Sequence, residues 1–163
     1  MKTLTLIRHA KSSWSDSVLS DIERPLNNRG LRDCELMAYQ ISKTGLNLKL
    51  VYCSPANRAL STAKLLLSEC DDIKFEVDEL LYTFSVHELH RWVMQLPEEL
   101  QDVVVIGHNP AITDYCNHFA NAQIINLPTC GFVRLKSSAE NWQSLSAKNT
   151  SVETILFPKM FKS

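Results

Sequence analysis

The sequence predicts an α/β fold, a three-layer sandwich in which helices cover both faces of a mainly parallel central sheet. Short runs rich in β-branched and large apolar residues alternate along the chain with longer amphipathic stretches. This alternation is typical of strands joined by crossover helices. The run DVVVI at residues 102–106 is apolar after its first residue, as expected of a parallel strand buried on both faces. With 163 residues, one core can bury most of the apolar surface, so we expect a single domain over residues 1–163.

Six runs are expected to form the sheet. Each is a short apolar stretch bounded by polar or turn-forming residues. In chain order they are LTLI at 4–7, LVYC at 50–53, KFEV at 74–77, DVVVI at 102–106, GFVRL at 131–135 and TILF at 154–157.

The first two helices follow the first two expected strands. The first spans residues 28–43 and is closed by Gly45. Its periodicity predicts these core-facing residues: Leu31, Cys34, Leu36, Met37, Tyr39 and Ile41. The second lies in SPANRALSTAKLLL, where Ser54 is expected to cap the helix and Pro55 to take its first position.

Two further helices are expected in the second half of the chain. Ser85 and Glu88 have the spacing of a capping box for a helix that runs to about residue 96. Asn109 and Pro110 follow the most apolar strand and are expected to open the fourth helix.

Composition and charge exclude several classes of protein. The formal net charge is −1, so no global positive field exists to hold a nucleic acid or an acidic membrane. No apolar run is long enough to span a bilayer, and charged residues 8–9 follow the first apolar run too soon for a signal peptide. The cysteines, which form no C-x-x-C pair, are Cys34, Cys53, Cys70, Cys116 and Cys130. An odd number without such a pair argues against a disulfide framework or a zinc clip, so we expect a cytoplasmic protein.

Basic residues follow three of the expected strands. Arg8 and His9 come directly after the first run, Arg58 lies shortly after the second, and His108 closely follows the fourth. In open α/β sheets ligands bind outside the carboxyl ends of the strands, so these side chains are expected to share one crevice. Arginine offers a planar fork for phosphate oxygens, and a helix N-terminus favours negative charge. The sequence therefore predicts an anion site in which a histidine acts as nucleophile or proton carrier.

Other patterns have more ordinary interpretations. Arg24 and Arg29 are as consistent with solvated side chains as with anion binding. The run HELH at 87–90 is one residue short of the zinc motif H-E-x-x-H, and histidines three apart on a helix are typical of its surface. Cys53 and Arg58 stand one residue too close together for a cysteine-phosphatase loop.

Four motifs, LIRHAKSSW, DIERPLNNRG, CSPANRALSTA and VIGHNP, resemble the histidine phosphatase superfamily, and most closely its small SixA-type phosphohistidine phosphatases. The likeness runs from Thr3 to Pro110, with a weaker echo in LPTCGFVRL and FPK. It implies a phosphoglycerate mutase-like fold and no metal ligand. The candidate catalytic residues that it implies are Arg8, His9, Arg58 and His108, of which Arg8, Arg58 and His108 bind phosphate.

The sequence departs from the common superfamily pattern at three places. Ala10 and Lys11 replace the usual Gly-Glu pair, as in SixA-type members, and Ser15 stands where many members have asparagine. We expect Lys11 and Ser15 to be substrate-binding residues. Larger members carry a glutamate general acid after the third strand, whereas DELLYTFS offers only Glu79 or Tyr82 nearby. Whether one of these two residues or a water supplies a proton stays open.

The resemblance implies a phosphatase that forms a covalent phosphohistidine on His9 and needs neither metal nor cofactor. Arg8 and Arg58 are expected to lower the pKa of His9, and a protonated His108 to hold phosphate oxygens. A missing acid favours a phosphoramidate such as phosphohistidine. The resemblance to SixA-type members implies that the partner is a phosphohistidine-bearing signalling or phosphotransfer protein. Two alternatives stay open: a phosphatase of small phosphoesters, and a phosphate-dependent binding module without turnover, for which His9 is not needed. The sequence leaves the partner's identity and the oligomeric state unknown.

Overall fold

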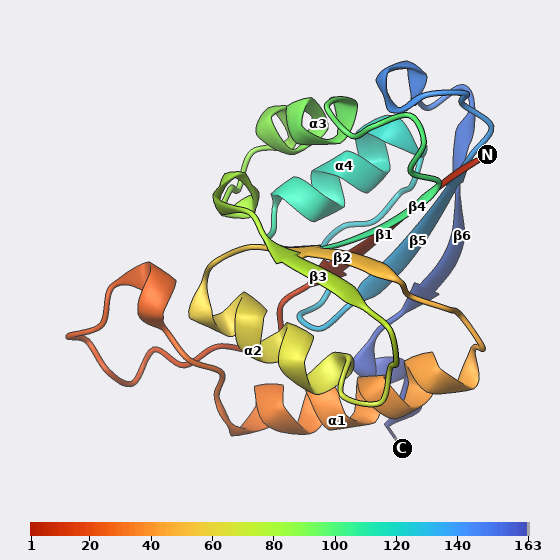
Figure 1. Ribbon diagram of the computed structural model, residues 1–163. Coiled ribbons are helices and arrows are strands. Elements are labelled where there is room, and N and C mark those ends of the chain that lie inside the picture. The colour runs from red at the N-terminus through yellow and green to blue at the C-terminus, as the bar shows by residue number, and fades with distance from the viewer. Residues whose placement is uncertain (163) are drawn as a thin grey trace.

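The computed structural model describes residues 1–162 and contains a six-stranded sheet between two pairs of helices (Figure 1). The strands are β1 Lys2–Arg8, β2 Leu50–Cys53, β3 Lys74–Val77, β4 Asp102–Gly107, β5 Phe132–Ser137 and β6 Thr150–Leu156. The helices are α1 Asn28–Lys43, α2 Asn57–Leu66, α3 Val86–Met94 and α4 Ala111–Phe119. Four short 3-10 helices are η1 Asp21–Glu23, η2 Glu79–Leu81, η3 Trp142–Ser144 and η4 Pro158–Phe161. Every expected strand and helix is present, and the predicted α/β sandwich is confirmed.

The order of the strands is β3-β2-β4-β1-β5-β6. The first four strands of the chain pair in parallel, whereas β5 and β6 join antiparallel at one side. The chain leaves β1 through α1 toward one edge of the sheet and leaves β4 through α4 toward the other. The carboxyl ends of β1 and β4 therefore form the point where the winding direction switches, which is the usual place for a ligand.

The apolar run of β4 is buried on both faces of the sheet. Val103 and Val105 belong to the core beneath α3 and α4, whereas Val104 and Ile106 belong to the core against α1 and α2. Figure 1 shows these two pairs of helices on opposite faces. Burial of each such side chain contributes about 1.5–3 kcal/mol to the stability of the fold. Strand β4 therefore holds firmly the end of the sheet where the candidate residues lie, beyond the carboxyl ends of the parallel strands.

Helix α1 has the predicted bounds but a narrower buried face than expected. The Asn27 side chain caps it by accepting a hydrogen bond from the Gly30 N–H at 2.8 Å. The apolar side chains buried along its face are Cys34, Met37 and Ile41. Leu31 and Tyr39 are exposed and Leu36 is only half-buried, so their predicted place in the core is wrong. At 3.6 residues per turn Tyr39 lies nearly opposite the buried stripe, and Leu31 lies to its side.

The start of α2 differs from the prediction. Ala56 is the N-cap residue and the helix begins at Asn57, so Ser54 is not its cap and Pro55 is not its first residue. Ser54 instead accepts the Ala56 N–H at 3.2 Å and hydrogen-bonds His108. The cap prediction was wrong because a serine in an S-P turn can serve the turn itself and a neighbouring side chain.

The other two predicted helix starts are correct to within one residue. Pro110 is the N-cap of α4, and the Asn109 side chain accepts the Thr113 N–H at 3.1 Å. Ser85 caps α3 as expected, but the Glu88 carboxylate accepts from the hydroxyl of Thr83, which leaves only half of the predicted capping box. Helix α3 ends at residue 94.

The segment from residue 10 to residue 27 is held against the start of α1. The Asn27 N–H donates to the Lys11 carbonyl oxygen at 3.0 Å. A Cβ atom at position 30 would lie 2.2 Å from that same oxygen, so only glycine permits the approach. This contact fixes the segment that follows Arg8 and His9. Within residues 1–162 no helix is both long enough and apolar enough to cross a membrane.

Candidate active site

The register of the sheet brings the four candidate residues together. Arg8 pairs with Gly107 across β1 and β4, so the residues that follow these two lie side by side. Cys53 pairs with Ile106 across β2 and β4, which places the start of α2 at the same edge. A cavity of about 280 Å³ opens there. It is lined by Arg8, His9, Lys11, Ser12, Trp14, Asp21, Arg24, Arg58, Phe84, Asn109 and Thr129.

His9 is buried and held in a single tautomer. Its Nδ1–H donates to the Ala10 carbonyl oxygen at 2.7 Å; because a carbonyl only accepts, the proton lies on Nδ1 and the lone pair on Nε2. Nε2 in turn accepts from the Nε–H of Arg58 at 3.3 Å. Burial lowers the pKa of His9 most, and the charges of Arg58 and Arg8 lower it further, to about 4. The imidazole is therefore neutral at pH 7, with its lone pair directed toward a guanidinium group.

We expect histidine-ring NMR to show His9 as the Nδ1-protonated tautomer at pH 7, titrating near pH 4. Since protonation of Nε2 removes the lone pair, any reaction that uses it should slow as the pH falls through about 4, and should be insensitive to this group between pH 5 and 7. A midpoint near 6.5, or an Nε2-protonated neutral ring, would contradict this arrangement.

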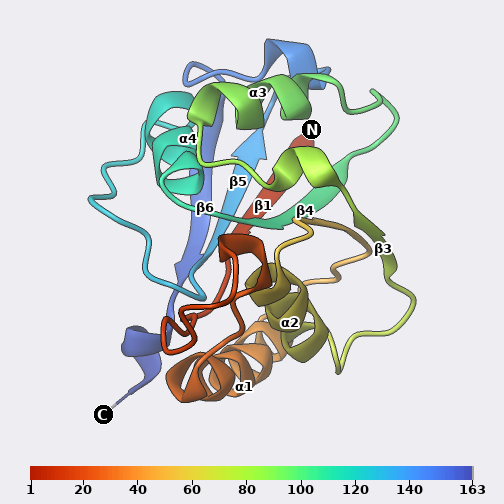
Figure 2. The same ribbon diagram turned by 90° about the vertical axis from the view of Figure 1, so that its left-hand side faces the viewer.

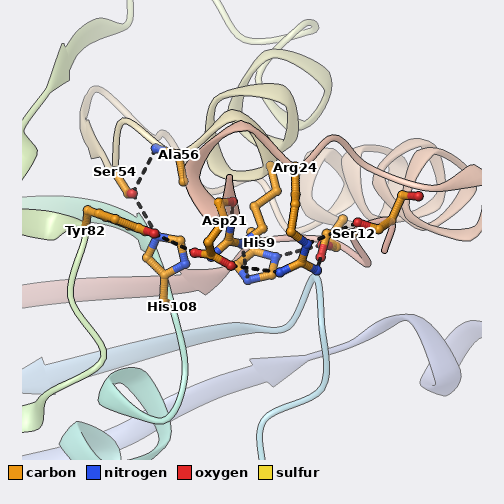
Figure 3. Close-up of polar contacts among 11 residues, drawn as sticks. His9, Ser12, Asp21, Arg24, Ser54, Ala56, Tyr82 and His108 are labelled. Atoms are coloured by element: carbon orange, nitrogen blue, oxygen red, sulfur yellow. Dashed lines mark hydrogen bonds and ion pairs between the residues drawn. The ribbon is translucent and has the colours of Figure 1, made fainter. Parts of the chain in front are cut away.

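Arg58, the second residue of α2, is held by Asp21 of η1. Its Nη2 donates to Asp21 Oδ2 at 2.9 Å and its Nη1 donates to the Asp21 carbonyl oxygen at 2.6 Å. The two terminal nitrogens of the Arg58 guanidinium group, which were expected to bind phosphate, thus bind Asp21. The Nε–H of Arg58 is the group that points toward His9. Figure 3 shows Asp21 between Tyr82 on one side and Arg24 on the other.

Asp21 supplies a partly exposed negative charge to this cationic site. Burial tends to raise the pKa of its carboxyl, but hydrogen bonds from Tyr82, Arg58 and Arg24 outweigh burial and hold the pKa at about 2. The carboxylate is ionised at pH 7, so it orients Arg58 and does not carry a proton to donate. The pKa of Tyr82 is raised, mainly by burial and by its bond to Asp21, so its hydroxyl remains a donor.

His108 lies against the other side of the site. Its Nε2 is 2.7 Å from Ser54 Oγ, and its ring centroid is 5.2 Å from that of His9. Burial above all, then His9 and Arg58, lowers the pKa of His108 to about 3. The ring is therefore neutral at pH 7 in this structure, and its protonation when it holds phosphate oxygens stays a prediction.

Two buried nitrogen atoms of the site have no hydrogen-bond partner within residues 1–162. They are Nε of Arg8 and Nδ1 of His108. Arg8 is otherwise fixed through its Nη1, which donates to the Leu127 carbonyl oxygen at 2.7 Å. Since Ser54 accepts from the Ala56 N–H, its hydroxyl proton can go to His108 Nε2, which leaves the ring proton on Nδ1. Buried donors are normally paired, so both fit an acceptor such as a phosphoryl oxygen.

Arg24 belongs to the site and is not simply solvated. It is buried, donates to Asp21 Oδ1 at 2.9 Å and to the Ser13 carbonyl oxygen at 3.1 Å, and also bonds Ser12. Its guanidinium carbon lies 3.2 Å from the ring centre of Trp14. Arg29 instead pairs with Asp33 at 3.5 Å on α1 and does not line the cavity.

The structure separates the remaining candidates. Lys11 is exposed and lines the cavity, whereas Ser15 bonds Ser13 at 2.8 Å and is not among the lining residues. The Tyr82 hydroxyl reaches Asp21, whereas Glu79 contacts Tyr82 through its backbone carbonyl oxygen and its carboxylate makes none of the described hydrogen bonds or ion pairs. Burial raises the pKa of the Cys53 thiol to about 12, so it is not a thiolate nucleophile. No cluster of metal-ligating side chains occurs within the described residues.

Two parts of the site could not be singled out from the sequence. Asp21 bonds Arg58 across 37 positions and Tyr82 across 61, and nothing in its local sequence signals these partners. Ser54 was noticed, but as a helix cap and not as the partner of His108. In both cases the role depends on contacts between segments that are far apart in the chain.

The chain belongs to the histidine phosphatase superfamily, branch 1, whose family model matches residues 4–90. This stretch contains Arg8, His9 and Arg58. The fold is phosphoglycerate mutase-like, as the resemblance implied.

Individual relatives agree with this family. An uncharacterized chloroplastic protein of Arabidopsis thaliana is 27% identical over 158 residues, which is 90% of this chain and 71% of that protein. A structure of a candidate phosphohistidine phosphatase SixA from Agrobacterium tumefaciens has a TM-score of 0.82 at 20% identity, covering 96% of this chain and 98% of that one. A structure of the protein histidine phosphatase SixA complexed with tungstate has a TM-score of 0.79 at 19% identity, covering 98% and 99%. At these identities the structural likeness establishes the fold.

Proposed function

We propose that this phosphatase hydrolyses phosphohistidine, without a metal ion, through a covalent intermediate on His9. The observation that carries the proposal is the state of His9. Its Nδ1–H is fixed on the Ala10 carbonyl oxygen, and Nε2 of the neutral ring is unprotonated, with its lone pair facing the Nε–H of Arg58. A phosphate-binding module needs only the donors and gains nothing from a positioned nucleophile.

In the first step His9 Nε2 attacks the phosphorus in line and the bond from phosphorus to the substrate's ring nitrogen breaks. The electron pair of that bond stays on the leaving imidazole, which takes a proton from water. In the second step water attacks the phosphorus, the bond to His9 Nε2 breaks, and phosphate leaves. Each step exchanges one bond to phosphorus for another, so positioning and charge stabilisation dominate catalysis.

The donors around His9 suit the charge that builds on the phosphoryl oxygens. Arg8 Nε and His108 Nδ1 are buried without partners among residues 1–162, and the Nε–H of Arg58 is directed at the attacking nitrogen. Such preorganised donors, held by the fold before the reaction begins, stabilise a transition state more than mobile donors in solution would. Binding of the anion would also favour a protonated His108.

The absence of a protonated carboxyl within this site favours a labile leaving group. Asp21 is held ionised, and Glu79 lies outside the described contacts of the site. A phosphoramidate needs little proton help, because its leaving imidazole is readily protonated by solvent, whereas an alkoxide is a poor leaving group. This reasoning supports phosphohistidine over small phosphoesters as the substrate. The structural likeness to SixA proteins, one of them bound to tungstate, points the same way.

A substrate panel tests this function. We expect the purified chain with excess EDTA to hydrolyse phosphohistidine and phosphoramidate at least about 100-fold faster than an alkyl phosphate, the size of effect that a missing general acid produces. Equal rates would show that an acid is present and would favour the small-phosphoester alternative. Activity lost with EDTA and restored by metal would contradict the mechanism, and binding of phosphate without turnover would support the binding-module alternative.

The wider setting follows from the same proposal. The substrate would be a phosphohistidine-bearing signalling or phosphotransfer protein, met in the cytoplasm, and residues 1–163 would act as one histidine phosphatase domain.

A further inference from the structure

We infer that three apolar side chains around the cavity form a docking rim for a protein whose phosphohistidine is flanked by apolar residues. The rim consists of Trp14, Phe84 and Ile125. The inference rests on the proposed function and adds to it the residues that select the substrate. A free phosphate or a small phosphoester would occupy only the cationic pocket and would leave this rim uncovered.

The three rim residues are among the exposed large apolar side chains of residues 1–162. The exposed fraction is 74% for Trp14, 46% for Phe84 and 99% for Ile125. They come from three separate segments, and Figure 2 shows the 121–130 loop descending on the left-hand side toward the 10–27 loop. Trp14 and Phe84 line the cavity, and Ile125 lies four residues before Thr129, which also lines it. Exposed large apolar side chains gathered around one site typically mark an interaction surface.

Trp14 and Phe84 are held in place by residues of the site itself. The buried guanidinium group of Arg24 covers one face of the Trp14 ring at 3.2 Å and leaves the other face to solvent. The Phe84 ring packs against Tyr82 and His108, with centroid separations of 5.6 and 5.2 Å. Rigid aromatic side chains lose little entropy on binding, which is why they are frequent anchors of interfaces.

Ile125 is exposed although its neighbours are fixed. Ile124 exchanges two hydrogen bonds with Asn117, at 2.8 and 3.0 Å. On the other side Asn126 accepts from Asn109 at 2.9 Å, and the Leu127 carbonyl oxygen accepts from Arg8. The loop therefore presents Ile125 to solvent from a backbone tied to the phosphate pocket. A loose loop would not hold it there.

The chemistry of the rim and the pocket together specifies the partner. The centre is cationic, with Arg8, Arg24 and Arg58, and exposed Lys11 adds positive charge at the mouth. An occupant that satisfies both parts presents a phosphoryl group on a side chain and apolar residues beside it. Trp14 and Phe84 line the catalytic cavity, and Ile125 precedes Asn126, which bonds the lining residue Asn109. Docking at the rim would therefore bring the phosphohistidine to His9 in the same encounter.

Two synthetic phosphohistidine peptides test the rim, one with leucines flanking the phosphohistidine and one with serines. For the wild type we expect kcat/KM to be at least about tenfold higher on the leucine peptide, and kcat/KM on phosphoramidate serves as the internal reference. Ile125→Ser and Trp14→Ser should each lower the ratio of leucine-peptide to phosphoramidate kcat/KM by about tenfold, as expected for partial burial of one large side chain. Met160→Ser, which removes a half-exposed methionine of η4, should leave the ratio unchanged.

The outcomes separate this inference from the function on which it rests. Phosphoramidate turnover without a preference for the leucine peptide would overturn the rim alone, as would a ratio that Ile125→Ser does not change. No turnover of phosphoramidate would refute the proposed function and the rim with it. A wild-type dimer that dissociates in Ile125→Ser would show that a second copy covers the rim, and this would also overturn the inference.

Discussion

His9→Ala is expected to reduce phosphohistidine hydrolysis to the uncatalysed background. The substitution removes the neutral ring whose Nδ1–H is fixed on the Ala10 carbonyl oxygen and whose unprotonated Nε2 faces Arg58. The phosphate-binding donors remain, so binding of an anion such as tungstate should persist while turnover is lost. Steady-state release of phosphate and tungstate binding by calorimetry measure the two effects separately.

His118→Ala provides the matched control, because His118 is exposed on α4 and does not line the cavity. It should retain wild-type turnover. Circular dichroism should show that His9→Ala is folded, and His9→Gln, which keeps a polar side chain of similar size, should be equally inactive. Turnover by either folded His9 variant at the wild-type rate would remove His9 from the mechanism.

Arg58→Ala is expected to lose about 100- to 1000-fold in kcat, the usual effect of deleting one preorganised donor to a transition state. It should keep a measurable remnant, because His9 and Arg8 are still present. The variant also removes one of the two guanidinium groups that pair with Asp21, so its carboxylate, still held by Arg24 and Tyr82, is less completely neutralised beside the incoming anion. Single-turnover kinetics would show the loss in the phosphoryl-transfer step.

Arg32→Ala removes an exposed arginine of α1 that lies outside the cavity and should have no effect. Arg58→Lys keeps the charge but not the three positioned N–H groups that reach Asp21 and His9, so it should also fall well below wild type. Full activity in Arg58→Lys would mean that charge alone matters and that the orientation by Asp21 does not.

The sequence predicted the parts of the fold that depend on local patterns. Helix α1 has the expected bounds, because its apolar stripe and the polar residue before it are local signals. The run of valines in β4 correctly indicated burial on both faces. Basic residues follow three of the parallel strands, and parallel strands have their carboxyl ends on the same side of the sheet. This was enough to predict that the candidate residues lie together beyond those ends.

The features that could not be predicted depend on contacts between distant segments. Which apolar residues of α1 are buried depends on how closely α2 and the sheet approach it, and Tyr39 lies outside that contact. Asp21 can bind the guanidinium group of Arg58 only because η1 folds back onto α2. The neutral state of His108 depends on the total burial of its ring, which no sequence pattern measures.

The most direct test of the central claim is to trap the covalent intermediate. Wild-type protein mixed with labelled phosphohistidine and quenched within milliseconds should carry an acid-labile, base-stable phosphoryl group that peptide mapping places on His9, and His9→Ala treated in the same way should carry none. A label on His108 or Cys53, or turnover with no protein-bound phosphoryl group at any quench time, would contradict the account.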